Sequence, residues 1–137
     1  MADENCLFCN KAEMAGRTLL STKHFFVVLD NFPVVPGHTL VISKRHIGDI
    51  FSLDDEEKND FWGVLAKVKV YLEHRFNPVA YNGGFNAGEI SGQTIPHFHF
   101  HVFPRHNGDM ENPRGGIRNF VQGKGDYSLR ENVGHEV

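Results

Sequence analysis

Short runs of apolar and β-branched residues, separated by polar turn residues, fill the first third of the chain. The runs cover residues 18–20, 24–29 and 39–42, and the turn-prone pairs Asp30-Asn31 and Pro36-Gly37 lie between the last two. Runs of this length and composition are typical of β-strands. The third run is apolar enough to predict a central strand of a sheet.

After Ser52 the apolar pattern changes to a helical period. Ser52 is a suitable helix cap, and the acidic residues 54–57 suit the first turn, where the helix dipole favours negative charge. Asn77-Pro78 predicts the end of the helix. The apolar stripe on one helical face, which we interpret as core packing, consists of Phe61, Leu65, Val68, Leu72 and Phe76.

A third kind of pattern, strict alternation, follows the helix. Residues 79–85 predict a strand in which Gly83-Gly84 marks a bulge or a close backbone approach. Residues 96–103 predict another strand, with Phe98, Phe100 and Val102 on one face. The opposite face then carries His97, His99, His101 and Phe103. Residues 107–137 show little periodicity and predict an irregular tail.

Composition narrows the class of protein. A chain of 137 residues suits one compact domain, and 40% hydrophobic with 23% charged residues is an ordinary globular balance. The net charge of −3 argues against a nucleic-acid partner, because phosphate-tracking proteins carry a basic excess. There is no apolar stretch long enough to span a membrane and no signal-peptide pattern, so we expect a cytoplasmic protein without a membrane partner.

Three interpretations of the histidine strand compete. The histidines are structural or lie on the surface; or two of them chelate a catalytic metal, as histidines at positions i and i+2 of a strand often do. In the third interpretation one neutral imidazole is a nucleophile and its neighbours donate hydrogen bonds to an anion, which suits two-step nucleotidyl transfer. The spacing alone leaves these alternatives open.

The only two cysteines, Cys6 and Cys9, are spaced C-x-x-C. In a reducing compartment this spacing indicates a metal clip or a redox pair before a structural disulfide. A closed tetrahedral zinc site needs two further ligands, and nine histidines are available, so the spacing does not select them. Two unliganded thiols are the remaining alternative.

The segment Gln93-Thr-Ile-Pro-His-Phe-His-Phe-His-Val-Phe-Pro-Arg105 resembles the signature of the histidine-triad family. The segment Pro33-Val-Val-Pro-Gly-His-Thr-Leu-Val-Ile42 is also similar to a segment of that family. The resemblance covers about residues 6–106. It implies an α+β fold in a single domain, residues 1–137, with a five-stranded antiparallel sheet and one long helix, and it implies pairing into a homodimer.

The resemblance also assigns roles by motif position. His99 is expected to be the nucleophile, His101 to donate a hydrogen bond to the phosphate or bridging oxygen, and His38 to belong to the polar network behind them. The nucleotide-contacting positions are expected to be Asp30 at the ribose, Asn86 and Thr94 at the phosphate or leaving group, and Gln93 in the adjoining loop. Asp30 taken alone is equally compatible with a simple turn position, and His38 taken alone favours a turn histidine that caps a strand.

In the zinc-containing branch of the family, the two cysteines share a structural zinc ion with two histidines, which map onto His46 and His97. Strand parity places His97 on the same face as His99, so it reaches zinc only if the strand begins irregularly after Pro96, and we expect that it does. The resemblance implies no catalytic cofactor, although a polyphosphate substrate can arrive with magnesium.

The branch of the family sets the expected activity. The sequences of residues 33–38 and of the tail resemble those of the diadenosine tetraphosphate hydrolase-like members of the family. This implies cleavage of dinucleoside polyphosphates at the α-phosphate through a nucleotidyl-histidine intermediate, with an AMP-type product. The alternatives are an adenosine phosphoramidate hydrolase, a nucleotide-binding sensor with little turnover, and a metal-dependent hydrolase.

Overall fold

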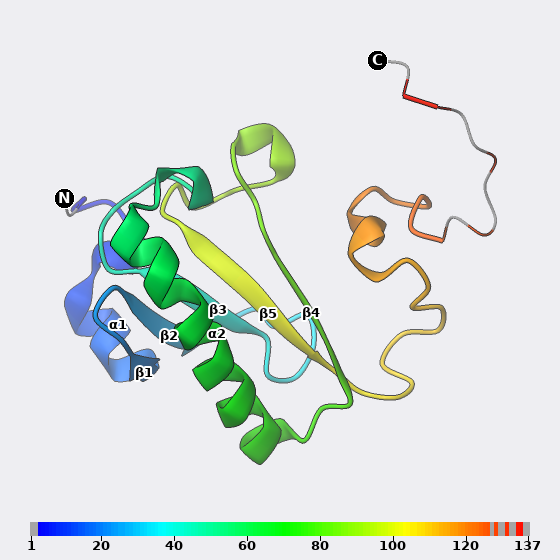
Figure 1. Ribbon diagram of the computed structural model, residues 1–137, viewed down its shortest axis with the longest axis horizontal. Coiled ribbons are helices and arrows are strands. Elements are labelled where there is room, and N and C mark those ends of the chain that lie inside the picture. Colours follow the sequence, from blue (N-terminus) through cyan, green and yellow to red (C-terminus); the bar gives the residue numbers. More distant parts are fainter. Residues whose placement is uncertain (1–2, 127, 129–130, 132–133, 136–137) are drawn as a thin grey trace.

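A computed structural model describes residues 3–126, 128, 131 and 134–135. A single antiparallel sheet of five strands, in the order β1-β2-β3-β5-β4, forms its centre (Figure 1). The architecture confirms the predicted α+β fold. The strands are β1 (Thr18–Ser21), β2 (Phe25–Leu29), β3 (Thr39–Ser43), β4 (Ala80–Phe85) and β5 (His99–Arg105).

Each face of the sheet is covered by a different helical layer. The long helix α2 (Asp55–Phe76) crosses one face, and its buried Val64, Val68 and Leu72 pack against strand residues such as Phe25 and Val41. The other face carries a smaller core that includes Phe8 and Met14, from the 3-10 turn η1 (Leu7–Cys9) and the helix α1 (Lys11–Arg17). The sequence pattern did not predict α1, a helix of only seven residues.

The start of α2 differs from the prediction. Ser52 ends a separate 3-10 turn, η2 (Ile50–Ser52), and the cap of α2 is Asp54. Asp54 accepts a hydrogen bond from the Glu57 backbone while the Glu57 side chain accepts one from the Asp54 backbone, so the two form a reciprocal capping box. Ser52 offers no such exchange, which explains why the cap is two residues later.

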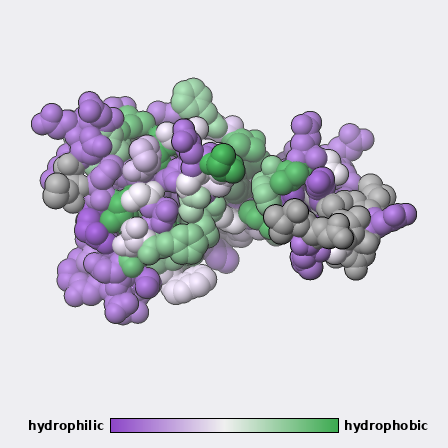
Figure 2. Space-filling view, turned by 90° about the horizontal axis from the view of Figure 1, so that it is seen from above, coloured by the Kyte–Doolittle hydropathy of each residue, from purple (hydrophilic) through white to green (hydrophobic). Residues whose placement is uncertain are grey.

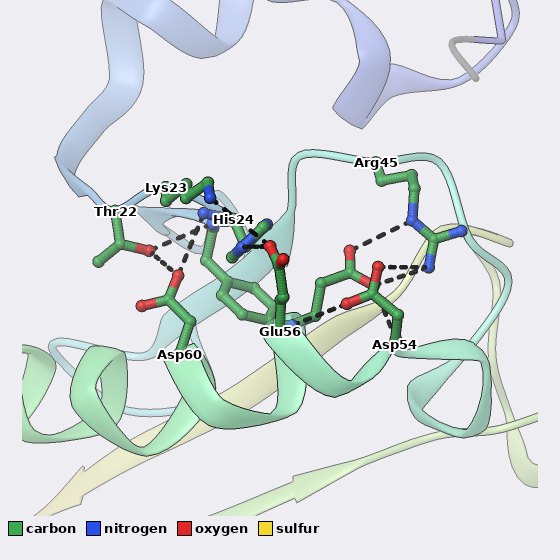
Figure 3. Close-up of polar contacts among 9 residues, drawn as sticks. Thr22, Lys23, His24, Arg45, Asp54, Glu56 and Asp60 are labelled. Carbon is green, nitrogen blue, oxygen red and sulfur yellow. Dashed lines mark hydrogen bonds and ion pairs between the residues drawn. The ribbon is translucent and has the colours of Figure 1, made fainter.

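Charged groups around the first turns of α2 connect the helix to the loops beside it (Figure 3). Glu57 is buried and ion-pairs with Arg45 at 2.7 Å. Asp60 accepts hydrogen bonds from the Thr22 hydroxyl and the His24 backbone. Because a buried carboxylate without a partner is costly, the Arg45–Glu57 pair holds the segment after β3 against the helix.

Two glycine positions lie so close to neighbouring residues that a Cβ would be crowded. Gly37 has φ +86°, and a Cβ there would lie 2.8 Å from the Pro104 side chain. A Cβ on Gly83 would lie 3.1 Å from the Phe100 ring. The predicted close approach at residues 83–84 is therefore confirmed, while β4 stays in regular register with β5 and has no bulge.

The chain after β5 forms an irregular arm beside β4 (Figure 1). The arm contains one 3-10 turn, η4 (Gly116–Phe120), and the Ile117 side chain of this turn lies against Gly84. In Figure 2 apolar side chains gather where the arm meets the main body, whereas hydrophilic ones cover most of the margin. The prediction of a tail over residues 107–137 includes residues 127, 129–130, 132–133 and 136–137, which lie outside the described residues.

Among the residues that the structure describes, no helix is long and apolar enough to cross a membrane.

Candidate functional site

The strand that carries the histidines begins later than its sequence pattern predicted. β5 starts at His99, and His97 lies before it in an irregular turn, where its backbone donates to the Ile95 carbonyl. The prediction that His97 shares a strand face with His99 is therefore wrong. The expected irregular start after Pro96 is confirmed, because β5 begins only at His99. The physical reason is that Pro96 has no N–H to contribute to a sheet ladder.

His99 is held by the turn that precedes its strand. Its Nδ1 donates a 2.8 Å hydrogen bond to the His97 carbonyl, which accepts and cannot donate. In the neutral ring the proton therefore sits on Nδ1, and Nε2 keeps its lone pair. The Phe8 ring packs edge-on against the imidazole with the ring centroids 5.2 Å apart. His99 thus lines the adjoining cleft with a fixed tautomer and a free nucleophilic nitrogen.

A second histidine pair lies beside His99. The Val34 N–H donates to His38 Nδ1 at 3.2 Å, so the proton of neutral His38 is on Nε2. His38 Nε2 then donates to His101 Nδ1 at 2.9 Å, which leaves the His101 proton on its own Nε2. Residues 34, 38 and 101 therefore form a relay that orients one N–H donor of His101. The Asp30 carboxylate lies 3.5 Å from His38 Nε2.

Burial keeps this pair neutral. Desolvation lowers the pKa of His101 to about 4, and the neighbouring His99 and His38 add to the shift. Burial also lowers the pKa of His38, against the opposing charge of Asp30. Asp30, His38 and His101 are close enough to hold a metal ion, but the facing nitrogens of the two rings are hydrogen-bonded to each other. This arrangement favours a hydrogen-bond relay over metal ligation.

A cleft of about 380 Å³ opens above these rings. Of the predicted nucleotide-contacting residues, the structure brings together on its wall Asp30, Asn86, Thr94, His99 and His101. Gln93 is not among the lining residues. Its side chain donates to the Gly48 and Ile95 carbonyls and accepts from the Gly88 backbone, so it ties the loop beside the cleft.

Part of the cleft lining was not predicted from the sequence. Besides the predicted positions, the cleft is lined by Leu7, Phe8, Arg17, Asn31, Phe32, Leu40, Gly92 and Ile95. Phe8 stands beside the conspicuous Cys9, but nothing in the local pattern indicates that α1 folds back toward the histidine strand. Nothing in the sequence around Arg17 predicts that its side chain lines the cleft.

The second cluster combines the two cysteines with two histidines. The ligand atoms of Cys6, Cys9, His46 and His97 all lie within 4.8 Å of one another. His97 Nδ1 is 3.4 Å from Cys6 Sγ, 3.5 Å from Cys9 Sγ and 3.0 Å from His46 Nδ1, and His46 Nδ1 is 3.3 Å from Cys9 Sγ. Tetrahedral zinc with ordinary Zn–S and Zn–N bonds places its ligand atoms about 3.3–3.8 Å apart. The donor set therefore fits a closed zinc site.

His97 is prepared for this cluster by the opposite ring nitrogen. Its Nε2 donates to the Ser43 carbonyl at 2.7 Å, which leaves the Nδ1 lone pair facing the thiols. The ring is completely buried, and desolvation lowers its pKa, so the imidazole is neutral as a metal ligand must be. The cluster lies on the irregular turn before β5, on η1 and on loops, and none of its four residues lines the cleft.

Comparison with known proteins identifies relatives of this chain. The HIT domain family model matches residues 11–108. The Bacillus subtilis "Protein hit" is 32% identical over 105 residues, which are 75% of this chain and 72% of that protein. The Schizosaccharomyces pombe bis(5'-nucleosyl)-tetraphosphatase [asymmetrical] is 32% identical over 104 residues, 76% of this chain and 57% of that protein. A crystal structure of a HIT family protein from Bacillus anthracis is 38% identical, with a TM-score of 0.70, and the match covers 80% of this chain and 78% of that one.

Proposed function

The chain belongs to the HIT family, and from that premise we propose that it hydrolyses dinucleoside polyphosphates at the α-phosphate, with His99 as the nucleophile. The observation that carries the proposal is the tautomer of His99, whose Nδ1 is anchored to the His97 carbonyl. Among the relatives, the name of the tetraphosphatase from S. pombe supports a nucleotide hydrolase with a dinucleotide substrate.

In the first step, His99 Nε2 attacks the α-phosphorus, and the bond from phosphorus to the bridging oxygen breaks. A covalent nucleotidyl-histidine forms while the remaining polyphosphate leaves. The His101 Nε2–H, oriented by His38, donates to the bridging or non-bridging oxygens, where charge develops. Preorganised donors of this kind supply a large part of enzymatic rate enhancement. Asn86 and Thr94 line the cleft and stand in reach of the same phosphate region.

In the second step, water attacks the phosphorus and the P–N bond to His99 breaks. AMP leaves, and the ring returns to its neutral tautomer because the His97 carbonyl still holds Nδ1–H. Asp30 is proposed to bind the ribose hydroxyls at the neighbouring strand end, where its second oxygen already accepts from the Phe32 backbone. Gln93 keeps the loop around this site in place without touching the nucleotide.

The metal cluster has a structural role in this proposal. Cys6, Cys9, His46 and His97 would hold zinc, which would cross-link the N-terminal segment to the turn that precedes His99. Thiolate ligands require reduced cysteines, so the proposal includes a reducing compartment such as the cytoplasm. No step of the reaction uses the metal.

A homodimer is also part of the proposal. β4 pairs only with β5, so its other edge is unpaired within the described sheet. Trp62 on α2 is 75% exposed, and Phe51, which contacts Phe85 at the end of β4, is 78% exposed. A strand edge without a pairing strand, together with large exposed apolar side chains on α2 and beside β4, supports a second copy of the chain as the partner.

The test is product analysis with diadenosine tetraphosphate and, separately, adenosine phosphoramidate. We expect AMP and ATP from the tetraphosphate, with loss of both products in His99→Ala. His74→Ala, which changes an exposed histidine on α2, is the matched control and retains activity. If AMP forms from the phosphoramidate and no product forms from the tetraphosphate, the protein is an adenosine phosphoramidate hydrolase. Absence of any His99-dependent product would favour a nucleotide sensor.

A chelator separates this mechanism from a metal-dependent hydrolase. Removal of zinc from protein that remains folded leaves a His99 mechanism active. Loss of turnover at a temperature where the metal-free protein is still folded would contradict the proposal.

A further inference from the structure

A second cavity, of about 710 Å³, lies between α1 and the sheet. Its walls come from η1, α1, β1, β2 and the segment that follows β3. It shares one lining residue with the cleft beside the histidines, Phe8, whose ring packs against His99 with the centroids 5.2 Å apart. Cavities of about 300–1,000 Å³ are typical of small-molecule sites. The proposed hydrolysis does not use this cavity, so its occupant has to be inferred from its own walls.

The inner wall of the cavity is apolar. Phe8 and Met14 are buried, with 5% and 3% of their surface exposed, and Phe26 is a half-buried residue of the same core. These side chains offer van der Waals contacts, and methionine adapts its shape to what it touches. The hydroxyl proton of Thr18 is already donated to the Met14 carbonyl at 2.7 Å. The inner wall therefore suits a hydrocarbon chain better than a sugar or a base.

The mouth of the cavity is positively charged. Lys11, Lys44 and Arg45 are exposed, and none of the described residues that line the cavity is acidic. Glu57 balances the charge of Arg45 through an ion pair at 2.7 Å. The Lys44 ammonium donates only to a backbone carbonyl, and the Lys11 side chain has no ionic partner within the described part of the chain. Two lysine charges at the mouth are thus uncompensated, although the chain as a whole has a net charge of −3.

We propose that this cavity binds an aliphatic carboxylate. The hydrocarbon chain lies against Phe8, Met14 and Phe26, and the carboxylate lies at the mouth, where it accepts hydrogen bonds from Lys11 and Lys44. The apolar inner wall and the cationic mouth together complement a ligand with an apolar body and a single anionic end. The site is separate from the proposed hydrolase chemistry, because the two cavities have only Phe8 in common.

The experiment measures equilibrium binding to the full chain by calorimetry, without a chelator so that any bound metal is retained. The ligands are hexanoate, octanoate, octanol, octylamine and AMP, with each amphiphile below its micelle concentration. Octanoate is expected to bind about tenfold more tightly than octanol, the usual scale for a hydrogen bond to a charged group, and octylamine more weakly than either. Hexanoate is expected to bind about fifteenfold more weakly than octanoate, because each buried methylene contributes about fourfold.

A pair of tryptophan variants on α1 locates the ligand. Ala15→Trp places a large side chain in the mouth of the cavity and is expected to abolish octanoate binding. Ala12→Trp places the same side chain at an exposed position of α1 that does not line the cavity, so it is the matched control and binds octanoate as the wild type does.

A pair of charge variants tests the mouth. Lys11→Gln combined with Lys44→Gln is expected to weaken octanoate binding about tenfold, to the level of octanol, and to leave octanol binding unchanged. Lys58→Gln combined with Lys67→Gln removes the same amount of charge from the exposed surface of α2 and is expected to preserve the preference for octanoate.

Four outcomes overturn the inference. Equal binding of octanoate and octanol to the wild type would show an apolar surface without an anion site. Unchanged octanoate binding in Ala15→Trp would place the ligand elsewhere. AMP binding that Ala15→Trp abolishes would assign the cavity to nucleotides. Absence of heat from both carboxylates at millimolar concentration would reject the site. The hydrolase is tested separately by turnover in His99→Ala, so either proposal can fail without the other.

Discussion

Two neighbouring histidines, His97 and His99, differ in which ring nitrogen is hydrogen-bonded to a backbone carbonyl, and they therefore have different roles. His97 donates from Nε2 to the Ser43 carbonyl and turns Nδ1 toward the thiols. His99 donates from Nδ1 to the His97 carbonyl and keeps Nε2 free for the cleft. The metal cluster and the reactive site are therefore distinguished by backbone carbonyls, since the residue type is the same in both.

The two regions are also connected. Phe8 packs edge-on against both rings, at 5.7 Å from His97 and 5.2 Å from His99, and the carbonyl that orients His99 belongs to His97 itself. Loss of metal should therefore lower the stability of the turn that carries this carbonyl, while the reactive ring can be removed without disturbing the cluster. The comparison teaches that the cluster contributes stability and the cleft contributes chemistry, although one turn belongs to both.

The largest expected effect comes from the reactive ring. His99→Ala should lower the rate of hydrolysis about 10⁴-fold or more, because a nucleophile that acts with its neighbours as a unit cannot be replaced by them. The free energy of unfolding should change by only about 1 kcal/mol, the scale of one hydrogen bond. Turnover assays and urea unfolding on the same preparation check both halves. A comparable loss of folding stability would break the separation of the two regions.

The metal cluster should show the reverse pattern. Replacing Cys6 and Cys9 by alanine should remove bound zinc and lower the free energy of unfolding by about 3 kcal/mol or more, because metal binding is coupled to folding. Metal analysis and thermal melting with and without a chelator provide the measurement. Unchanged melting after chelation, or no zinc in the wild type, would contradict the structural role.

The relay behind His101 should have an intermediate effect. His38→Ala removes the donor that fixes the His101 tautomer and is expected to lower kcat about 10²-fold with little change in KM. His38→Gln carries an amide N–H at a similar distance along the side chain and should restore much of the rate. Equal losses in the two variants would show that His38 acts through packing alone.

The smallest effect concerns pH. The pKa of His101 is about 4 in the folded protein and about 6.5 for an ordinary histidine, so between these values the unfolded chain binds more protons. Stability should therefore be intact above pH 6.5 and fall as the pH drops toward 4, by up to about 3 kcal/mol from this group. Urea unfolding at pH 7 and pH 4.5 should show a loss about 2 kcal/mol smaller in His101→Gln than in the wild type.

The exposed His74 supplies the control for this pH dependence. His74→Gln should reproduce the wild-type difference between the two pH values, because an exposed histidine is solvated in both states. If His101→Gln and His74→Gln behave alike, burial of His101 does not contribute to acid sensitivity.

Periodicity predicted the regular elements well. The three early strands, the strand before the histidines and the long helix lie within a few residues of their predicted positions. β2, β3 and α2 bury apolar side chains, which gives a clear sequence pattern, whereas β1 and β4 are only partly buried. The short helix α1 was missed, since seven residues with a single buried side chain, Met14, leave no period to detect. The helix cap moved from Ser52 to Asp54, where a reciprocal partner exists.

The sequence by itself determined the apolar periods and the supply of chemical groups, including the three closely spaced histidines and the cysteine pair. Both are properties of adjacent residues. Only the tertiary structure decided which nitrogen of each ring is free, that His46 faces Cys9, and that the Arg17 side chain lines the cleft. These depend on carbonyls and walls contributed by distant segments, such as Ser43 for His97, and hydrogen-bond direction is set only when those segments meet.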